Sequence, residues 1–179
     1  MGETVQTAKQ TTALAGKYLT FKLVEEEYGL EILKVREIIG MMAITRVPRT
    51  PDFVRGVINL RGKVIPVIDL RKKFGMEATV DTEETCIIVV DVARAAEKLQ
   101  IGILVDSVSE VLDIKAEDIE DAPSFGSDLD TEFIMGMAKA KGSVKILLNI
   151  EKVLSHNELE ALKAGGEGLG QIRPQAGAS

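Results

Sequence analysis

The side chains that most often carry catalysis or bind metals are scarce in this chain. Its 179 residues include one histidine and one cysteine. His156 lies on a predicted C-terminal helix, in a polar context typical of a solvated helix residue. Cys86 opens a predicted apolar strand, with no histidine nearby in the sequence to activate its thiol, and is expected to pack in the core. Too few ligands are present for a typical zinc site, so the sequence predicts no metal and no cofactor.

Acidic residues and glycines offer the remaining candidates for chemistry. Asp69, Asp91 and Asp106 lie at predicted strand ends or turns, where carboxylates usually accept hydrogen bonds from backbone amides. The acidic run 117–121 lacks the glycine and spacing of a calcium loop. The glycine-rich segment 165–170 has neither a strand before it nor a helix after it, unlike a nucleotide-binding loop. These features predict a protein that is not an enzyme, and a catalytic aspartate pair is the less favoured alternative.

Composition limits the partners. The net charge is −6, so the chain lacks the basic footprint expected for nucleic-acid binding. A single cysteine excludes an intramolecular disulfide and fits a reducing compartment. No stretch approaches the roughly 18 apolar residues of a membrane-spanning helix, and residues 1–16 lack the apolar run of a signal peptide. We therefore expect a cytoplasmic protein whose contact with a membrane, if any, goes through a partner.

The ordered part is predicted to be β-rich. Residues 1–16 are expected to form a disordered arm and residues 164–179 a flexible tail. Between them, in 17–163, short apolar runs alternate with turn signals, as in small barrels. The predicted strands are 18–24, 30–39, 57–60, 64–70, 86–92, 101–105 and 144–150.

Local signals refine these elements. Gly62 supplies the backbone angle of a hairpin turn, and Pro66, which cannot donate to a ladder, predicts an edge or bulged strand at 64–70. Residues 93–99 are expected to form a charged loop, and the acidic segment 113–131 a long connection. Helical turns are predicted at 52–55 and 70–74, and one longer helix at 150–163.

The second half of the chain repeats the first. Segment 29–39 resembles 102–112, shifted by 73 residues (Gly29 to Gly102), and segment 53–70 resembles 133–150, shifted by 80 residues. Glycines recur at matching places in both pairs, and backbone geometry decides where glycine is needed. The repeat therefore predicts two similar β subdomains in one chain.

Arg61 differs from its counterpart in the repeat. The first hairpin turn reads Asn59-Leu60-Arg61-Gly62, and only its glycine is kept in the second repeat. Because a turn needs the glycine but not the arginine, Arg61 is a candidate binding residue, whose guanidinium can make forked hydrogen bonds. The alternative is that Arg61 only solvates the turn.

Taken together, several segments resemble the CheW family of chemotaxis coupling proteins. They are 28–38 (YGLEILKVREI), 45–48 (TRVP), 56–71 (GVINLRGKVIPVIDLR), 105–111 (VDSVSEV) and 146–154 (ILLNIEKVL). These motifs occur in the family's order, and the resemblance covers nearly all of 17–155.

The resemblance implies a mainly β fold. It consists of two intertwined SH3-like five-stranded β-barrels, with a few short helices and a C-terminal helix. It also implies an adaptor that joins the cytoplasmic tip of methyl-accepting chemotaxis receptors to the regulatory domain of the histidine kinase CheA, in receptor arrays at the inner membrane. Neither nucleic acid nor a small-molecule substrate is expected as a partner.

Two sets of binding residues follow. The resemblance implies receptor contact or coupling through Val35, Glu37, Gly56, Asn59, Arg61, Val105 and Val108. The loop 46–53 holds two prolines, which lower the cost of ordering a contact, and it is a candidate kinase-binding loop. The residues proposed there are Arg46, Pro48, Arg49, Thr50, Pro51 and Phe53. The alternative is that the loop is a structural bend that closes the first barrel.

Related proteins suggest other functions for the same module. CheA-like kinases add an ATPase domain and a phosphorylatable histidine, and CheV-like proteins add a receiver domain, none of which is expected in this chain. A stand-alone coupler in flagellar chemotaxis is the favoured interpretation. A coupler in a pilus or other non-flagellar system is the alternative.

Overall fold

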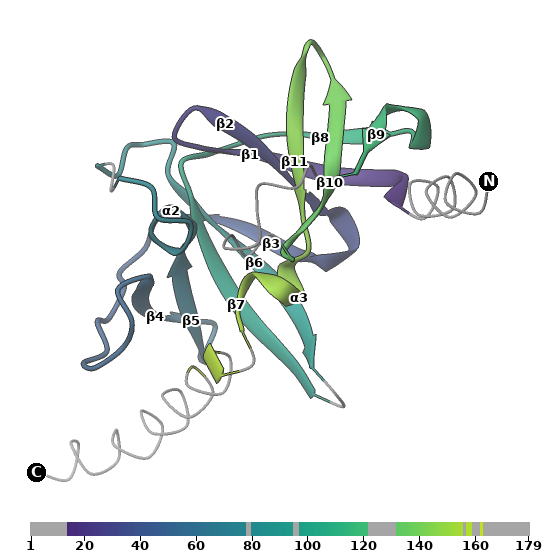
Figure 1. The fold of residues 1–179 in the computed structure, drawn as a ribbon. Helices are drawn as coiled ribbons and strands as arrows, with labels where there is room; N and C mark the ends of the chain where they lie inside the picture. The colour runs from purple at the N-terminus through teal and green to yellow at the C-terminus, as the bar shows by residue number, and fades with distance from the viewer. Residues whose placement is uncertain are drawn as a thin grey trace, which may run out of the picture.

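The computed structural model describes residues 14–77, 80–94, 97–121, 132–155, 157–158 and 162 (Figure 1). The predicted tail 164–179 and His156 lie outside these residues, as does most of the predicted arm 1–16. The end of that arm is not disordered, because β1 begins at Gly16. The elements are β1 (Gly16–Leu23), β2 (Glu26–Glu31), the 3₁₀ turn η1 (Ile32–Lys34), β3 (Val35–Gly40), β4 (Val54–Leu60), β5 (Lys63–Asp69), α2 (Leu70–Lys73), β6 (Cys86–Arg94), β7 (Glu97–Val105), β8 (Ser107–Ile114), the 3₁₀ turn η2 (Ala116–Asp118), β9 (Ile119–Glu120), β10 (Ile134–Ala140), β11 (Ser143–Leu148) and α3 (Ile150–Val153). None of the helices within the described ranges is both long enough and apolar enough to span a membrane.

The strands form two sheets that exchange hairpins. One sheet has the order β8-β1-β2-β11-β10-β9 and the other β3-β6-β7-β5-β4. The β1–β2 hairpin of the first repeat thus lies in the sheet of the second repeat, and β6–β7 lies in the sheet of the first. Figure 1 shows the β4–β5 and β10–β11 hairpins on opposite sides of the molecule. The predicted mainly β fold of two intertwined SH3-like barrels is confirmed.

The two exchanges use the same geometry. The strand β5 pairs parallel with β7, and β11 pairs parallel with β2. At each parallel pair, a strand of an exchanged hairpin pairs with a strand of the other repeat. The two strands of a parallel pair cannot be joined by a tight turn, so a long stretch of chain separates them in the sequence. The first sheet has six strands rather than five because of the two-residue strand β9. Its counterpart in the other sheet is a single antiparallel bridge between Thr45 and Val57.

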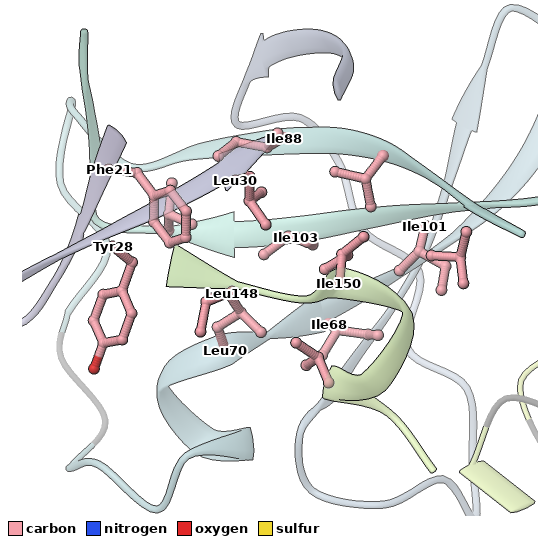
Figure 2. Close-up of a cluster of buried hydrophobic side chains, with 14 of the residues drawn as sticks. Phe21, Tyr28, Leu30, Ile68, Leu70, Ile88, Ile101, Ile103, Leu148 and Ile150 are labelled. Atoms are coloured by element: carbon pink, nitrogen blue, oxygen red, sulfur yellow. The ribbon is translucent and has the colours of Figure 1, made fainter. Parts of the chain in front are cut away.

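Three apolar clusters account for the long Val/Ile/Leu runs. One cluster fills the five-stranded barrel and includes Val67, Ile87 and Leu104. A second fills the other barrel, around Tyr18 and Leu147. The third, shown in Figure 2, lies between the two sheets and contains the next residues along the same strands, such as those labelled Phe21, Ile68, Ile88, Ile103 and Leu148. Of the exchanged strands, β6 is continuously buried over residues 87–90 and β7 over residues 101–105, so both stretches lack polar side chains.

Several local predictions were wrong. The strand predicted at 30–39 is interrupted by η1, and residues 52–55 form a turn leading into β4 rather than a helical one. The predicted loop 93–99 belongs mostly to β6 and β7, which continue to Arg94 and from Glu97. The connection predicted at 113–131 includes the end of β8, η2 and β9.

Pro66 does not lie on an edge strand, but the pairing of β4 with β5 is irregular close to it, with a register shift between Val54 and Gly56. The strand β5 has neighbours on both sides, β4 and β7. The ladder with β7 begins only at Val67, so Pro66 precedes the first residue that pairs with that strand. The missing amide therefore costs no ladder hydrogen bond on that side.

The predicted C-terminal helix is also broken. The helix α3 ends at Val153, and Leu154 is extended. Ser155 then begins a new helical turn: its hydroxyl accepts from the Glu158 amide (3.1 Å), and the Glu158 carboxylate accepts from the Ser155 amide (2.8 Å). This is a capping box, whose S-x-x-E pattern is visible in the sequence. The predicted helical turn at 70–74 is confirmed as α2.

Candidate partner-binding site

The turn between β4 and β5 carries two of the candidate residues. Arg61 and Gly62 have φ values of 53° and 87°, the left-handed pair of a two-residue hairpin turn. The side-chain oxygen of Asn59 accepts a hydrogen bond from the Gly62 amide (2.8 Å). Asn59 therefore holds the turn while its side chain stays exposed.

Arg61 forms an ion pair with Glu37 of β3. Two guanidinium nitrogens face the two carboxylate oxygens, so the contact is forked. Since β3 and β4 are the outer strands of the five-stranded sheet, the pair links the β4–β5 turn to the opposite edge. The hydrogen bond that the Arg61 guanidinium donates to Glu37 raises the pKa of Arg61. The Arg61 side chain nevertheless remains 72% exposed.

The second barrel has an equivalent ion pair between its hairpin turn and its edge strand, with lysine in place of arginine. Lys141 has a φ of 50° and donates to Glu110 of β8 (2.6 Å). Glu110 occupies the place of Glu37 in the repeat. The ion pair is therefore common to both barrels, and what distinguishes Arg61 from Lys141 is its planar, forked head group.

An open pocket lies beside the first of these ion pairs. It is lined by Arg36, Glu37, Leu60, Arg61, Lys63, Ile65 and Gln100. In the second barrel the counterpart of Ile65 is Lys145, which is buried and bonds to Glu27 (2.8 Å) and to the Ala140 carbonyl (2.7 Å). At this place the first barrel has an apolar residue beside a pocket bordered by cations, and the second has a buried lysine paired with a partly exposed glutamate.

The three candidate valines differ in burial. Val35 and Val108 are half-buried and pack against the central cluster. Val35 is the first residue of β3, and Val108 is the second residue of β8. Val105 has no exposed surface. It therefore supports the core and does not face a partner in this conformation, unlike the groove residue expected from the sequence.

Gly56 is required by the backbone. It has a φ of +145°, and a Cβ placed there would lie 2.2 Å from the Thr45 carbonyl oxygen. That oxygen accepts from the Val57 amide, and the Thr45 amide donates to the Val57 carbonyl, both at 2.8 Å. The close approach of the two segments explains the glycine without any partner.

The loop 46–53 places its candidate residues in two environments. Arg46, Pro48, Arg49 and Pro51 are exposed. All of these except Arg49 line an open pocket, together with residues that include Arg55 and Lys72. The Thr50 hydroxyl bonds the Val47 carbonyl (2.8 Å) and fixes the bend. Phe53 is half-buried against the central cluster, with the Lys73 ammonium 4.9 Å from its ring centre, so most of its ring is turned away from a partner.

A buried cationic centre lies between the two barrels, and the sequence did not reveal it. Arg71 is fully buried and forms a forked pair with Asp69 (2.9 and 3.0 Å). A further nitrogen donates to Asp106 (2.7 Å), and Asp81 also contacts the guanidinium (3.3 Å). The hydrogen bonds that Arg71 donates to Asp69, followed by the charges of Asp69 and Asp106, raise the pKa of Arg71 above its ordinary range, against the effect of burial.

Two of the candidate aspartates accept backbone hydrogen bonds, as predicted. Asp69 accepts from the Arg71 amide at the start of α2 (3.0 Å), and Asp106 accepts from the Val24 amide (2.5 Å). Asp91 pairs with Arg36 (3.5 Å). Cys86 is half-buried, and burial raises the pKa of its thiol. Within the described ranges no cluster of His, Cys, Asp or Glu is arranged to hold a metal ion.

The fold and surface place the protein in the class of small β modules built from two strand-exchanged SH3-like barrels. Residues 17–158 match the CheW-like domain family, and the chain belongs to that family. It is 44% identical to the chemotaxis protein CheW of Klebsiella aerogenes over 143 residues, which are 80% of this chain and 84% of that protein. It is 34% identical to CheW of Rhizobium meliloti, covering 86% of this chain and 97% of that one.

A solved structure agrees with this assignment. The crystal structure of the scaffolding protein TtCheW from Thermoanaerobacter tengcongensis is similar with a TM-score of 0.71 and 38% identity. The match covers 80% of this chain and 95% of that one.

Proposed function

We propose that this protein is a non-enzymatic scaffold that couples transmembrane chemoreceptors to the histidine kinase CheA in bacterial chemotaxis. The observation that carries the proposal is the match of nearly the whole described chain, in sequence and in fold, to proteins named for chemotaxis and scaffolding. Residues 17–163 would form the functional domain, with its membrane association supplied by the receptor.

The receptor site is proposed around the first barrel's ion pair. A receptor hairpin would need apolar contacts along its ridge and a donor that fixes its register. Val35 and Val108 offer partly exposed apolar surface, and Arg61, with the neighbouring cation-bordered pocket, offers donors for carboxylates. Val105 and Gly56 would contribute by supporting the backbone rather than by contact.

Replacing Arg61 by alanine tests this site. Interface arginines often cost about 2 kcal/mol when truncated, which is roughly a thirtyfold loss of affinity. The fold should survive, because an exposed ion pair contributes only about 0–1 kcal/mol. Arg61→Lys should restore binding only in part, since an ammonium lacks the planar fork. The measurement is titration with a receptor cytoplasmic fragment, with circular dichroism as the folding control.

The repeat provides a matched control for this experiment. Lys141 holds the same turn position in the second barrel and makes the same kind of ion pair. Lys141→Ala should leave receptor affinity unchanged. Equal losses in both variants, or wild-type affinity for Arg61→Ala, would contradict the proposed site.

The kinase contact is proposed at the loop 46–53. Its exposed arginines and preset bend offer a surface that costs little to order. Changing Arg49 and Thr50 to aspartate should weaken binding of the CheA regulatory domain and spare receptor binding. Unchanged kinase affinity would remove the loop from the proposal, and micromolar ATP affinity by calorimetry would contradict the non-enzymatic scaffold itself.

A further inference from the structure

The chain crosses between the two barrels at two equivalent places. The turn η1 leads from β2 of the six-stranded sheet into β3 of the five-stranded sheet. Asp106 leads from β7 of the five-stranded sheet into β8 of the six-stranded sheet. Each crossover directly follows a strand that pairs in parallel with the other repeat, β2 with β11 and β7 with β5. The position of the crossover is therefore expected to affect the orientation of one barrel relative to the other.

Each crossover is tied by an ion pair to the helix that follows the neighbouring parallel strand. Lys34 of η1 donates to Glu151 of α3 (2.6 Å). Asp106 accepts from Arg71 of α2 (2.7 Å). Glu151 and Arg71 occupy the same place in the repeat, shifted by 80 residues, whereas Lys34 corresponds to Ser107, the residue after Asp106. The two ties therefore join corresponding segments, one residue apart at the crossover, with their charges in the opposite order.

The tie at Asp106 is internal and multiply bonded. The Arg71 side chain is 1% exposed and also holds Asp69. The other oxygen of Asp106 accepts from the Val24 amide in the β1–β2 turn, and its own amide donates to the Lys22 carbonyl (3.0 Å). One guanidinium therefore connects the end of β5 in one sheet to a turn of the other. Breaking such a buried set leaves charges without partners, so it is expected to stay closed.

The tie at Lys34 is open to solvent. The two side chains are 35% and 33% exposed, and the hydrogen bond that Lys34 donates to Glu151 raises the pKa of Lys34, which keeps it charged. Ion pairs with this exposure are weak and are screened by salt. Leu33, next to Lys34, is 90% exposed, and Val35 begins β3 directly after it. This tie therefore holds the segment that presents apolar side chains at the junction of the barrels.

We propose that the Lys34–Glu151 pair is a latch that sets the relative orientation of the two barrels and positions Val35, while the Arg71–Asp106 connection is a permanent pivot. Opening the latch removes the polar contact between η1 and α3 and leaves the buried charges in place, while Ile32 of η1 and Ile150 of α3 stay packed in the central cluster. Lys34 and Glu151 are then positioning residues for the proposed receptor site, a consequence that rests on the proposed receptor binding. The orientation itself does not rest on it.

The distance between the hairpin tips tests the latch directly. Spin labels are placed at Lys63→Cys and Ser143→Cys, exposed and equivalent positions in the two barrels, in a Cys86→Ala background. Pulsed electron paramagnetic resonance should show a broadened or shifted distance distribution for Lys34→Ala and for Glu151→Ala, with no further change in the double variant. High salt should move the wild type in the same direction, and the exchanged pair Lys34→Glu with Glu151→Lys should restore the narrow distribution.

A control of the same chemistry is available within one barrel. Lys139 and Glu120 form an ion pair at 2.7 Å with exposures of 64% and 63%. Lys139→Ala should leave the distribution unchanged. Unchanged distributions in both latch variants, whose retained fold is checked by circular dichroism, would overturn the proposal, as would an equal change in Lys139→Ala.

A receptor-binding measurement distinguishes failure of the latch from failure of the proposed function. With a receptor fragment, Lys34→Ala should lower affinity about two- to fivefold, the range expected for losing one exposed pair. A changed distance distribution with wild-type affinity would refute the positioning of Val35. Failure of the wild-type protein to bind the fragment would instead refute the proposed receptor binding, and the distance measurement would still decide the latch.

Discussion

Replacing Gly56 by alanine is expected to destabilise the first barrel strongly. The new Cβ would lie 2.2 Å from the Thr45 carbonyl oxygen and 2.9 Å from a side-chain carbon of Ile44. A backbone oxygen cannot yield as the end of a flexible side chain can. The segment before the loop 46–53 must therefore move away from β4, which breaks the bridge between Thr45 and Val57.

The magnitude follows from two contributions. The bridge consists of two backbone hydrogen bonds of 2.8 Å, which contribute on the order of 1 kcal/mol each. A φ of +145° is strained for any residue with a Cβ, which adds about 1 kcal/mol. The expected loss in the free energy of unfolding is thus about 3 kcal/mol, or roughly 6–12 °C in the unfolding midpoint for a chain of this size. Stabilities of about 5–15 kcal/mol are usual, so the variant should still fold.

Urea denaturation followed by circular dichroism measures this loss, and the repeat supplies the control. Gly136 is the counterpart of Gly56, and a Cβ there would meet the Glu120 carbonyl oxygen at 3.0 Å, without a left-handed φ. Gly136→Ala should cost about 1 kcal/mol, since its neighbours need to give only a few tenths of an ångström. Equal losses in the two variants, or a wild-type denaturation midpoint for Gly56→Ala, would refute the reasoning. If the expected loss of stability is found, weak receptor binding by Gly56→Ala reflects the damaged fold and not a lost contact.

Three further predictions concern ionisable groups. Burial raises the pKa of Tyr18 from 10.0 to about 12, so stability is complete below pH 10.0 and declines as the pH rises toward 12. Tyr18→Phe should flatten this alkaline decline in urea midpoints, and an unchanged slope would argue against it. The hydrogen bond from Lys145 lowers the pKa of Glu27 below 4.5, so its stabilisation is present above that pH and is lost as the pH falls through the folded value. Glu27→Gln should therefore reduce the acid-side slope; a slope as steep as that of wild type would count against it. Arg71→Leu should lower the free energy of unfolding by about 3 kcal/mol because the buried Asp69 carboxylate loses its nearest cation, and a loss below about 1 kcal/mol would show that Arg55, 3.6 Å from Asp69, or water replaces it.

Local sequence patterns predicted most of the strands and turns correctly. The hairpin glycine at 62, the apolar runs and the helical turn at 70–74 all match the structure, because each depends on a few neighbouring residues. The same patterns gave wrong predictions in places where other contacts decided the structure. The helix expected at 150–163 is broken because the capping box of Ser155 and Glu158 starts a new turn, and the charged residues near 94–97 continue a two-stranded ladder instead of forming a loop.

The candidate site was predicted in part. The repeat directed attention to Arg61, and the structure gives the reason for that turn's charge in its pairing with Glu37. The equivalent pairing of Lys141 with Glu110 could have been inferred, since both glutamates and both cations keep their places in the repeat. The burial of Val105 and the half-burial of Phe53 could not, since apolar residues at strand ends and in loops read alike whether they face the core or a partner.

By itself, the sequence determined that the chain contains two copies of one β unit, because glycine spacing and apolar runs record backbone geometry and burial. Only the tertiary structure decided how the copies are joined. The exchange of the β1–β2 and β6–β7 hairpins depends on pairings between residues far apart, such as Leu148 with Leu30. The contacts of Arg71 with Asp106 and of Lys34 with Glu151 span 35 and 117 residues. Side chains so distant leave no periodic trace, and their pairing follows from the packing of two whole barrels.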